Sequence, residues 1–307
     1  MGLINKLGAM FRPSPAAGDA ALGHALALLN KSVDPKLMSL PAAQEKLVPA
    51  IEVAFDYYRR VVAQIPGPVS VAIDRYYDDE ILATLFPTAD DIAQGLGRSI
   101  AVRDSINWFI DHGHDNVFAL LGVRVRPHAT DGRASFVDHT IRSLGTDEAD
   151  CRECICAAAF TSLVKAYTDR MKDKQREWGL LHTEGRLQQE LKTRTGSDGG
   201  NAAGAATAGD DAFDSQIASA VQETSPERSL EVLINWLHAP DQRLRVETGE
   251  GHPLIGPLDD DGKCRLQMPT LASADRRRWL VCLVNFSLQE TLDAVKRETQ
   301  AHRYILI

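Results

Sequence analysis

The longest amphipathic pattern in the chain runs from Asp150 to Arg194, a stretch that contains no proline. At about 100° per residue, most of its apolar residues fall on one stripe, which is typical of a helix packed against a core. The residues of this stripe are Cys156, Phe160, Leu163, Val164, Tyr167, Met171, Trp178 and Leu181. After Gly179, the leucines Leu180, Leu187 and Leu191 lie on a different face. The pattern predicts one long helix, about residues 150–192, whose second half has different contacts from its first half.

Shorter helices are predicted on both sides of the long helix. Steps of three and four residues between apolar positions, with start and stop signals, predict helices over 19–29, 41–64, 88–97, 99–111, 213–221 and 225–239. Thr88 with Asp91 matches a capping box, and Ser225 is a suitable N-cap residue. Pro49 should kink its helix or move the start of that helix later. The acidic residues Asp78–Glu80 precede another apolar run, and we interpret them as a helix start, where negative charge is favoured.

A β-hairpin is predicted in the middle of the chain. The run Val117–Arg126 ends in alternating valine and arginine, and after a turn around Asp131 a second β-rich run covers Ser135–Ile141. We expect these runs to pair in an antiparallel hairpin, with His139 in the neighbourhood of His114.

Other strands are predicted to be short. Val69–Ile73 alternates as a strand does, and two further short strands are expected at 244–246 and 264–268. These last two strands could form a separate hairpin or could add to the sheet of the first one. From Ser273 toward His302 we expect a final helix, which should be largely buried because residues 279–286 are apolar around most of its circumference.

Taken together, these elements predict an α+β fold that is mostly helical, with one or two small antiparallel β-hairpins and one long helix. Residues 195–212 are rich in Gly, Ala, Ser, Thr and Asp, a composition that favours a flexible linker. The linker divides the chain into a helical body, 18–194, and a C-terminal helix–hairpin–helix part, 213–307, which could still pack into the same domain.

Residues 1–17 are predicted to be a tethered amphipathic segment. Leu3, Ile4, Leu7 and Phe11 share one face of a helix, and prolines at 13 and 15 separate this helix from the rest of the chain. Such a helix is suited to docking on a protein partner or an anionic membrane surface. The alternative is a helix that folds back on its own core, or a frayed terminus.

Composition narrows the class of protein. The chain has 307 residues, 44% of them hydrophobic and 25% charged, with a formal net charge of −8. This negative charge argues against general nucleic-acid binding, which needs a positive surface. The longest apolar runs are far below the roughly 20 residues that a transmembrane helix needs. Five cysteines without a disulfide framework indicate a reducing compartment, so we expect a soluble cytoplasmic protein.

One cluster of residues has the chemistry of a metal site. Cys151 and Cys154 form a C-x2-C pair at the start of the long helix, where they are predicted to point away from the core, whereas Cys156 points into it. Zinc takes thiolate and imidazole ligands in sets of four, and His112 and His114 could complete such a set. The same thiol pair could instead carry redox chemistry at the helix N-terminus. The competing interpretation is that these residues are structural.

Sequence motifs for catalysis are absent. The chain has no G-x-S-x-G elbow, no phosphate-binding loop of the Walker A type and no H-E-x-x-H sequence. No other cofactor is indicated. We therefore expect a non-enzymatic interaction or adaptor protein, and the alternative is a metal-dependent or thiol-dependent enzyme or sensor that uses Cys151 and Cys154 with the nearby histidines.

Overall fold

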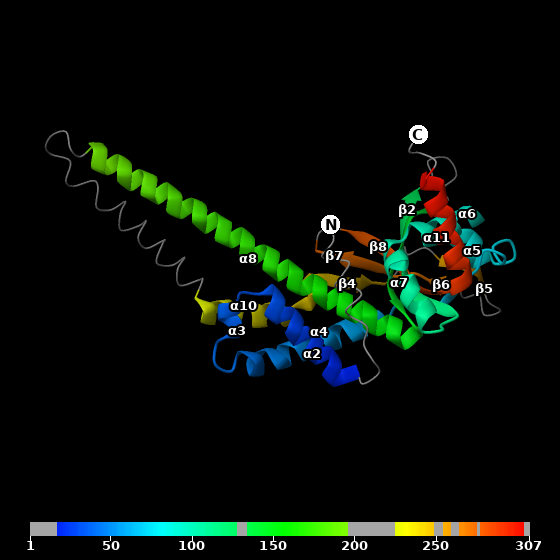
Figure 1. The fold of residues 1–307 in the computed structure, drawn as a ribbon, viewed down its shortest axis with the longest axis horizontal. Helices are drawn as coiled ribbons and strands as arrows, with labels where there is room; N and C mark the ends of the chain where they lie inside the picture. The colour runs from blue at the N-terminus through cyan, green and yellow to red at the C-terminus, as the bar shows by residue number, and fades with distance from the viewer. Residues whose placement is uncertain are drawn as a thin grey trace. The chain divides into compact units, whose positions relative to one another are not determined.

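The fold is known from a computed structural model, which describes residues 17–127, 134–195, 225–248, 254–258, 264–274 and 277–303. It is an α+β fold dominated by helices, with a small, mainly antiparallel sheet and one long helix, so the predicted fold class is confirmed (Figure 1). The predicted N-terminal segment, the linker and the helix at 213–221 lie outside the described residues.

The helices are α2 (Ala17–Ser32), α3 (Pro35–Met38), α4 (Ala43–Ala63), α5 (Glu80–Leu85), α6 (Ala89–Arg98), α7 (Ile100–Asp111), α8 (Glu148–Thr195), α10 (Pro226–Leu237) and α11 (Leu288–Arg303). The strands are β1 (Val69–Val71), β2 (Asn116–Pro127), β3 (Ala134–Gly145), β4 (Leu244–Glu247), β5 (Leu254–Leu258), β6 (Cys264–Gln267), β7 (Thr270–Ser273) and β8 (Arg278–Ser287). A short 3-10 helix, Pro240–Gln242, precedes β4.

The helix starts follow the predicted capping chemistry. The Thr88 hydroxyl accepts a hydrogen bond from the Asp91 backbone N–H (3.2 Å), and the Ser225 hydroxyl accepts one from Arg228 at the same distance. Asp79 caps α5, because one of its carboxylate oxygens accepts from two backbone N–H groups of the first turn. These side chains satisfy donors that a helix leaves unpaired at its N-terminus. Pro49 lies within α4, which starts before it at Ala43.

The described residues belong to two compact units. The first takes its residues from Met1–His24, Ala54–Phe160 and Ala239–Ile307, and the second takes them from Ala25–Val53 and Thr161–His238. Since the boundaries fall within α2, α4 and α8, each of these helices contributes residues to both units.

The first unit is built around a six-stranded sheet with β8 at its centre. The strand order is β3-β2-β8-β7-β4, and β1 also pairs with β8. Along one edge of β8 lies β2, in an antiparallel pairing from Val123↔Leu280 to Asn116↔Ser287. On the other edge, β7 pairs with the first residues of β8 and β1 runs parallel to Val284–Phe286. Of the two C-terminal strands predicted from the sequence, 244–246 corresponds to β4 and adds to this sheet through β7. The other, 264–268, corresponds to β6, which pairs with β5 in a separate two-stranded sheet.

The prediction of one final helix from Ser273 onward is wrong. Residues 278–287 form β8, and the helix α11 begins only at Leu288. The strand is buried on both faces between Leu280 and Val284, so its apolar residues do not alternate with polar ones. A run that is apolar all round fits a buried strand as well as a buried helix, and only its content of valine and aromatic residues favours the strand.

One face of this sheet carries the main core of the unit. Alternate residues of β2 and β8, among them Leu121, Val123, Cys282 and Phe286, pack against buried residues of α5, α6, α7 and α11. Figure 1 shows these four helices gathered around the sheet. Burying a large aliphatic or aromatic side chain stabilises a fold by about 1.5–3 kcal/mol, so this cluster is the principal source of stability of the sheet.

Parts of α4 and α8 that belong to the same unit are anchored to the two ends of the strand order. The Tyr57 hydroxyl donates to the carbonyl oxygen of Leu244 in β4 at 2.9 Å, and the Cys151 thiol donates to the carbonyl oxygen of Ser143 in β3 at 3.2 Å. The rings of Phe55 and Phe160 stack at 4.8 Å between their centres. These contacts fix the first turns of α8 beside the sheet.

Arg152 in α8 completes the end of α4. Its guanidinium donates to the carbonyl oxygens of Val62 (2.6 Å) and Ile65 (3.1 Å). The last carbonyl groups of a helix lack partners within that helix, so a cation at this point satisfies them and is favoured by the helix dipole. Arg59 strengthens the same packing through its ion pair with Glu153 at 3.2 Å.

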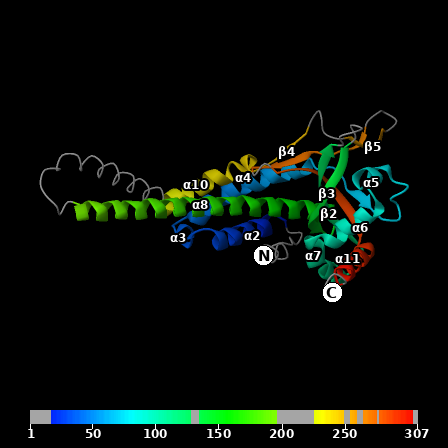
Figure 2. The same cartoon turned by 90° about the horizontal axis from the view of Figure 1, so that it is seen from above.

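The second unit joins the middle of α8 to α10. The Tyr167 hydroxyl donates to the carbonyl oxygen of Ser229 (3.0 Å), and the Trp236 indole N–H donates to that of Leu163 (3.0 Å). The two rings also meet edge to face. Figures 1 and 2 both show α10 beside this part of α8. The predicted core stripe of the long helix is confirmed here, since Leu163, Val164 and Tyr167 are buried.

Candidate functional site

The predicted outward direction of Cys151 and Cys154 is wrong. Cys151 is 0% and Cys154 is 8% exposed, so both are buried, as Cys156 is. A helical wheel assigns the core to a single stripe, but the first turns of α8 are covered on more than one side because β3 leads directly into them. The thiol of Cys151 faces this strand and donates to Ser143.

The junction between β3 and α8 is unusually close. Ser143 has a φ of 52° at an irregularity in the β2–β3 pairing, and its carbonyl oxygen accepts a hydrogen bond from the thiol of Cys151. A Cβ atom on Gly145 would lie 2.3 Å from the backbone nitrogen of Cys151. Only glycine fits at this position without a shift of the backbone of α8.

Burial also suppresses thiol reactivity. It raises the pKa of Cys151 far above its ordinary value, with smaller contributions from Cys154 and Asp150, and it raises the pKa values of Cys156 and Cys282 to about 12. A nucleophilic or redox-active cysteine needs an accessible thiolate at neutral pH. These thiols have the properties of structural residues, and the structure gives no support to thiol chemistry.

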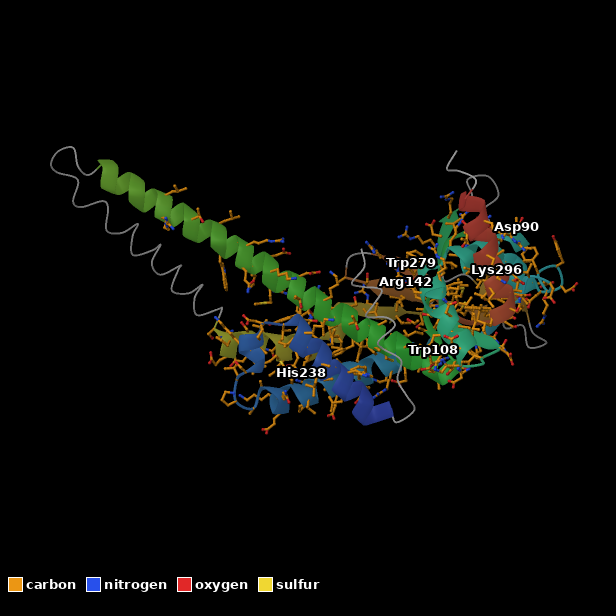
Figure 3. All side chains as sticks on the ribbon, in the orientation of Figure 1. Asp90, Trp108, Arg142, His238, Trp279 and Lys296 are labelled. Carbon is orange, nitrogen blue, oxygen red and sulfur yellow. The ribbon has the colours of Figure 1, made fainter. Side chains whose placement is uncertain are left out.

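The predicted histidine ligands lie on α7 and the loop that follows it. The rings of His112 and His114 stack on Trp108, with centres 3.9 Å and 5.7 Å from that of the indole. His112 also has Nδ1 2.8 Å from the carbonyl oxygen of Trp108 at the end of the helix. Trp108 is labelled in Figure 3. Both histidine rings therefore pack at the C-terminal end of α7.

His139 does not lie near His114 as the sequence analysis expected. It is in the interior of β3, beside the pair Gly122↔Thr140, and the start of β2 faces Gly145 because β3 is longer than predicted. Its ring stacks on Phe86 at 4.5 Å, and its Nε2 is 2.7 Å from the carbonyl oxygen of Leu85. His139 thus connects β3 to α5.

The predicted zinc ligands are not assembled into a site. Within the described ranges, no group of three or more His, Cys, Asp or Glu side chains is placed to hold a metal ion. The Cys151 and Cys154 thiols already have hydrogen-bond partners at the start of α8. The His112 and His114 rings already stack on an indole ring at the end of α7.

A stacked arrangement that the sequence analysis did not single out covers one end of the sheet. The ring of Trp279 lies over Gly122, where an added Cβ atom would meet the indole at an ordinary contact distance of 3.5 Å. The guanidinium of Arg124 lies over the same ring and pairs with Asp138 at 3.5 Å. Trp279 is labelled in Figure 3. A glycine beneath an aromatic ring on a neighbouring strand is the signal that could have identified this feature.

The outer stretch of α8, Met171–Thr195, is the strongest candidate for a functional surface. Just before it, the guanidinium of Arg170 lies 5.4 Å from the centre of the Trp236 ring and so connects α8 to α10. Further along the helix, Leu180 is 72% and Leu187 is 55% exposed.

Residues seven apart differ by only about 20° around a helix, so Leu180 and Leu187 form a single exposed apolar stripe. On the opposite side, Met171, Lys174 and Trp178 are half-buried. The predicted change of face after Gly179 therefore corresponds to a change from half-buried to exposed apolar residues.

The chain matches no protein-family model, no curated protein and no solved structure. In the part of the chain that the structure describes, no helix is both long enough and apolar enough to cross a membrane.

Proposed function

We propose that this chain is a non-enzymatic interaction or adaptor protein of the cytoplasm, and that the outer stretch of α8 is a surface on which it binds another protein chain. The observation that carries the proposal is the pair of exposed leucines on one face of a continuous helix, Leu180 and Leu187. An amphipathic helix that offers apolar anchors seven residues apart is a common mode of recognition between proteins.

Leu180 and Leu187 would gain free energy by leaving water on binding. A leucine that moves from water into an apolar contact contributes about 1.5–3 kcal/mol, whereas single exposed apolar residues scattered over a surface need no explanation. Leu180 and Leu187 share a face, and the helix around them is preformed, so binding would not require the backbone to become ordered.

Location in the cytoplasm is supported by the cysteines. The four cysteines whose side chains are described, Cys151, Cys154, Cys156 and Cys282, are free thiols, as expected in a reducing compartment.

The N-terminal segment belongs to the same proposal. Leu3, Ile4, Leu7 and Phe11 lie outside the described residues, and their docking on a protein partner or an anionic membrane surface stays a prediction. Deletion of residues 1–17 should abolish recovery of the chain with its partner or with anionic vesicles while leaving the melting temperature unchanged. Unchanged recovery would contradict this role of the segment.

Site-specific photo-crosslinking tests the surface on α8. A photoreactive amino acid replaces Leu180 or Leu187 in the full chain, and matched control variants carry it at the exposed positions Lys172 and Gln175 of the same helix. We expect protein adducts from positions 180 and 187 at several times the yield from the controls. Equal yields at the four positions would overturn the proposal.

A further inference from the structure

We infer that the protein chain that binds the outer stretch of α8 is a second copy of this chain, and that the two helices pair in antiparallel orientation. This inference rests on the proposed function, because it identifies the partner of the same surface. Homo-oligomers with two-fold symmetry are the commonest soluble assemblies, and in them one patch binds its own copy.

The charges along the stripe select the orientation. With about 100° per residue, Asp173 and Arg176 lie on the same side of α8 as Leu180 and Leu187. Both charged side chains are more than 70% exposed, and they are joined to each other by a surface ion pair at 3.4 Å. In a parallel pair in register, each would face the identical residue of the second helix, which places like charges opposite each other.

Antiparallel pairing removes this conflict. A two-fold axis midway between Leu180 and Leu187 places Leu180 of one copy beside Leu187 of the other. The same axis places position 173, seven residues before Leu180, opposite position 194, seven residues after Leu187. The sequence has aspartate at the first position and arginine at the second. The apolar anchors and the opposite charges thus coincide in a single register.

The length of the helix is sufficient for this pairing. From Asp173 to Arg194 the helix rises by about 32 Å at 1.5 Å per residue, which corresponds to three heptads. All of these residues lie within α8, which is continuous to Thr195. Met171 and Trp178 lie on the half-buried side of the helix, opposite the leucines. A second copy bound to the leucine face would therefore leave the packing of these two side chains unchanged.

Sedimentation velocity of the full chain over a range of concentrations tests the inference. We expect a dimer that dissociates on dilution. Replacing both Leu180 and Leu187 with aspartate should raise the dimer dissociation constant at least about tenfold, since buried leucines become charged groups. An unchanged circular dichroism spectrum would show that the variant keeps its helix content. A chain that is monomeric at all accessible concentrations, or a dimer insensitive to this double substitution, would overturn the inference.

A charge exchange tests the orientation independently of the leucines. The single variants Asp173→Arg and Arg194→Asp should each weaken the dimer, because each places like charges opposite each other. The double variant should restore the dimer, since the charges are exchanged. Failure of the double variant to restore association overturns the antiparallel register. If adducts form at positions 180 and 187 with another protein and the chain remains monomeric, the proposed function stands and the second copy is excluded as the partner. If neither adducts nor dimers form, both fail.

Discussion

The guanidinium carbon of Arg124 lies 4.4 Å from the centre of the Trp279 ring, so two strands that are distant in the sequence are joined by a cation stacked on an indole. The side chain of Arg124 is about half exposed and also pairs with Asp138 at 3.5 Å. A stacked cation of this kind contributes about 0.5–1 kcal/mol at an exposed site. The exposed ion pair between Arg124 and Asp138 contributes a similar amount or less to stability.

We therefore expect Arg124→Ala to lower the free energy of unfolding by about 1 kcal/mol. Trp279→Ala should cost more, about 2–3 kcal/mol, because it also uncovers Gly122. Urea denaturation of the two single variants and the double variant measures the coupling between the side chains. Strict additivity of the two effects would show that the stacking contributes nothing to stability.

Two glycines in and beside α8 should respond to the same substitution in opposite ways. Gly145→Ala should destabilise the protein by several kcal/mol, because its Cβ would lie 2.3 Å from the backbone nitrogen of Cys151 and no side chain can move aside. Gly179→Ala meets nothing within 4 Å, and it should stabilise the helix by about 0.5–1 kcal/mol. Thermal denaturation of both variants checks the pair. A tolerated alanine at position 145 would contradict the close junction of β3 and α8.

The buried thiols should be protected from alkylation in the native protein. At pH 8, Cys151, Cys156 and Cys282 should react with iodoacetamide at least about a hundredfold more slowly than in urea, because burial raises their pKa values and blocks access. Mass spectrometry of peptides after timed labelling measures the rates. Rapid labelling of Cys151 or Cys154 in the folded chain would revive the thiol-dependent hypothesis, and elemental analysis of the same sample tests for zinc.

Glu290 should make stability depend on pH. Desolvation, followed by the nearby charge of Asp74, raises the pKa of this carboxyl group above its usual value, although a backbone hydrogen bond from Ile73 opposes the shift. The folded state then binds the proton more tightly than the unfolded state, so ionisation of Glu290 costs stability at neutral pH. This cost decreases as the pH falls through the raised pKa.

Glu290→Gln should accordingly raise the melting temperature slightly at pH 7.5, by about 1–2 °C, and the difference from the parent chain should shrink near pH 4. Asp293→Asn is a matched control on the same helix, since Asp293 is exposed. Differential scanning calorimetry at both pH values measures the effect. An advantage of the glutamine variant that grows toward low pH would have the wrong sign for this explanation.

The helices were the most predictable part of the fold. For α4, α7 and α10, a one-sided apolar pattern coincides with clear start signals, as at Ser225, whose hydroxyl caps α10. Each of these helices has one buried side and one solvent side, so the spacing of its apolar residues predicts both the helix and the side that is buried. The hairpin of β2 and β3 was predicted for the same reason, although β3 extends further, to Gly145.

The centre of the sheet was less accessible to prediction. Since β8 is buried on both faces, its sequence has no period from which strand and helix can be told apart, and its partners lie elsewhere in the chain. The same limit explains Cys151, since the strand that covers it ends just before α8 and does not belong to the pattern of the helix itself. The strand conformation of β8 and the burial of Cys151 both depend on tertiary contacts with other elements.

The position of β8 in the chain also constrains how the protein folds. This strand pairs with Val69–Val71 and with residues 116–123, so the sheet is closed by contacts between residues more than 150 positions apart. Contacts of such high sequence separation slow folding, because loop entropy is lost before the contacts form. During synthesis, β2 and β3 leave the ribosome long before β8 does. Until β8 has been synthesised, β2 lacks its partner at the centre of the sheet and the apolar face of the hairpin stays uncovered. While that face is uncovered, the nascent chain exposes the kind of apolar surface and unpaired strand edge that promotes aggregation.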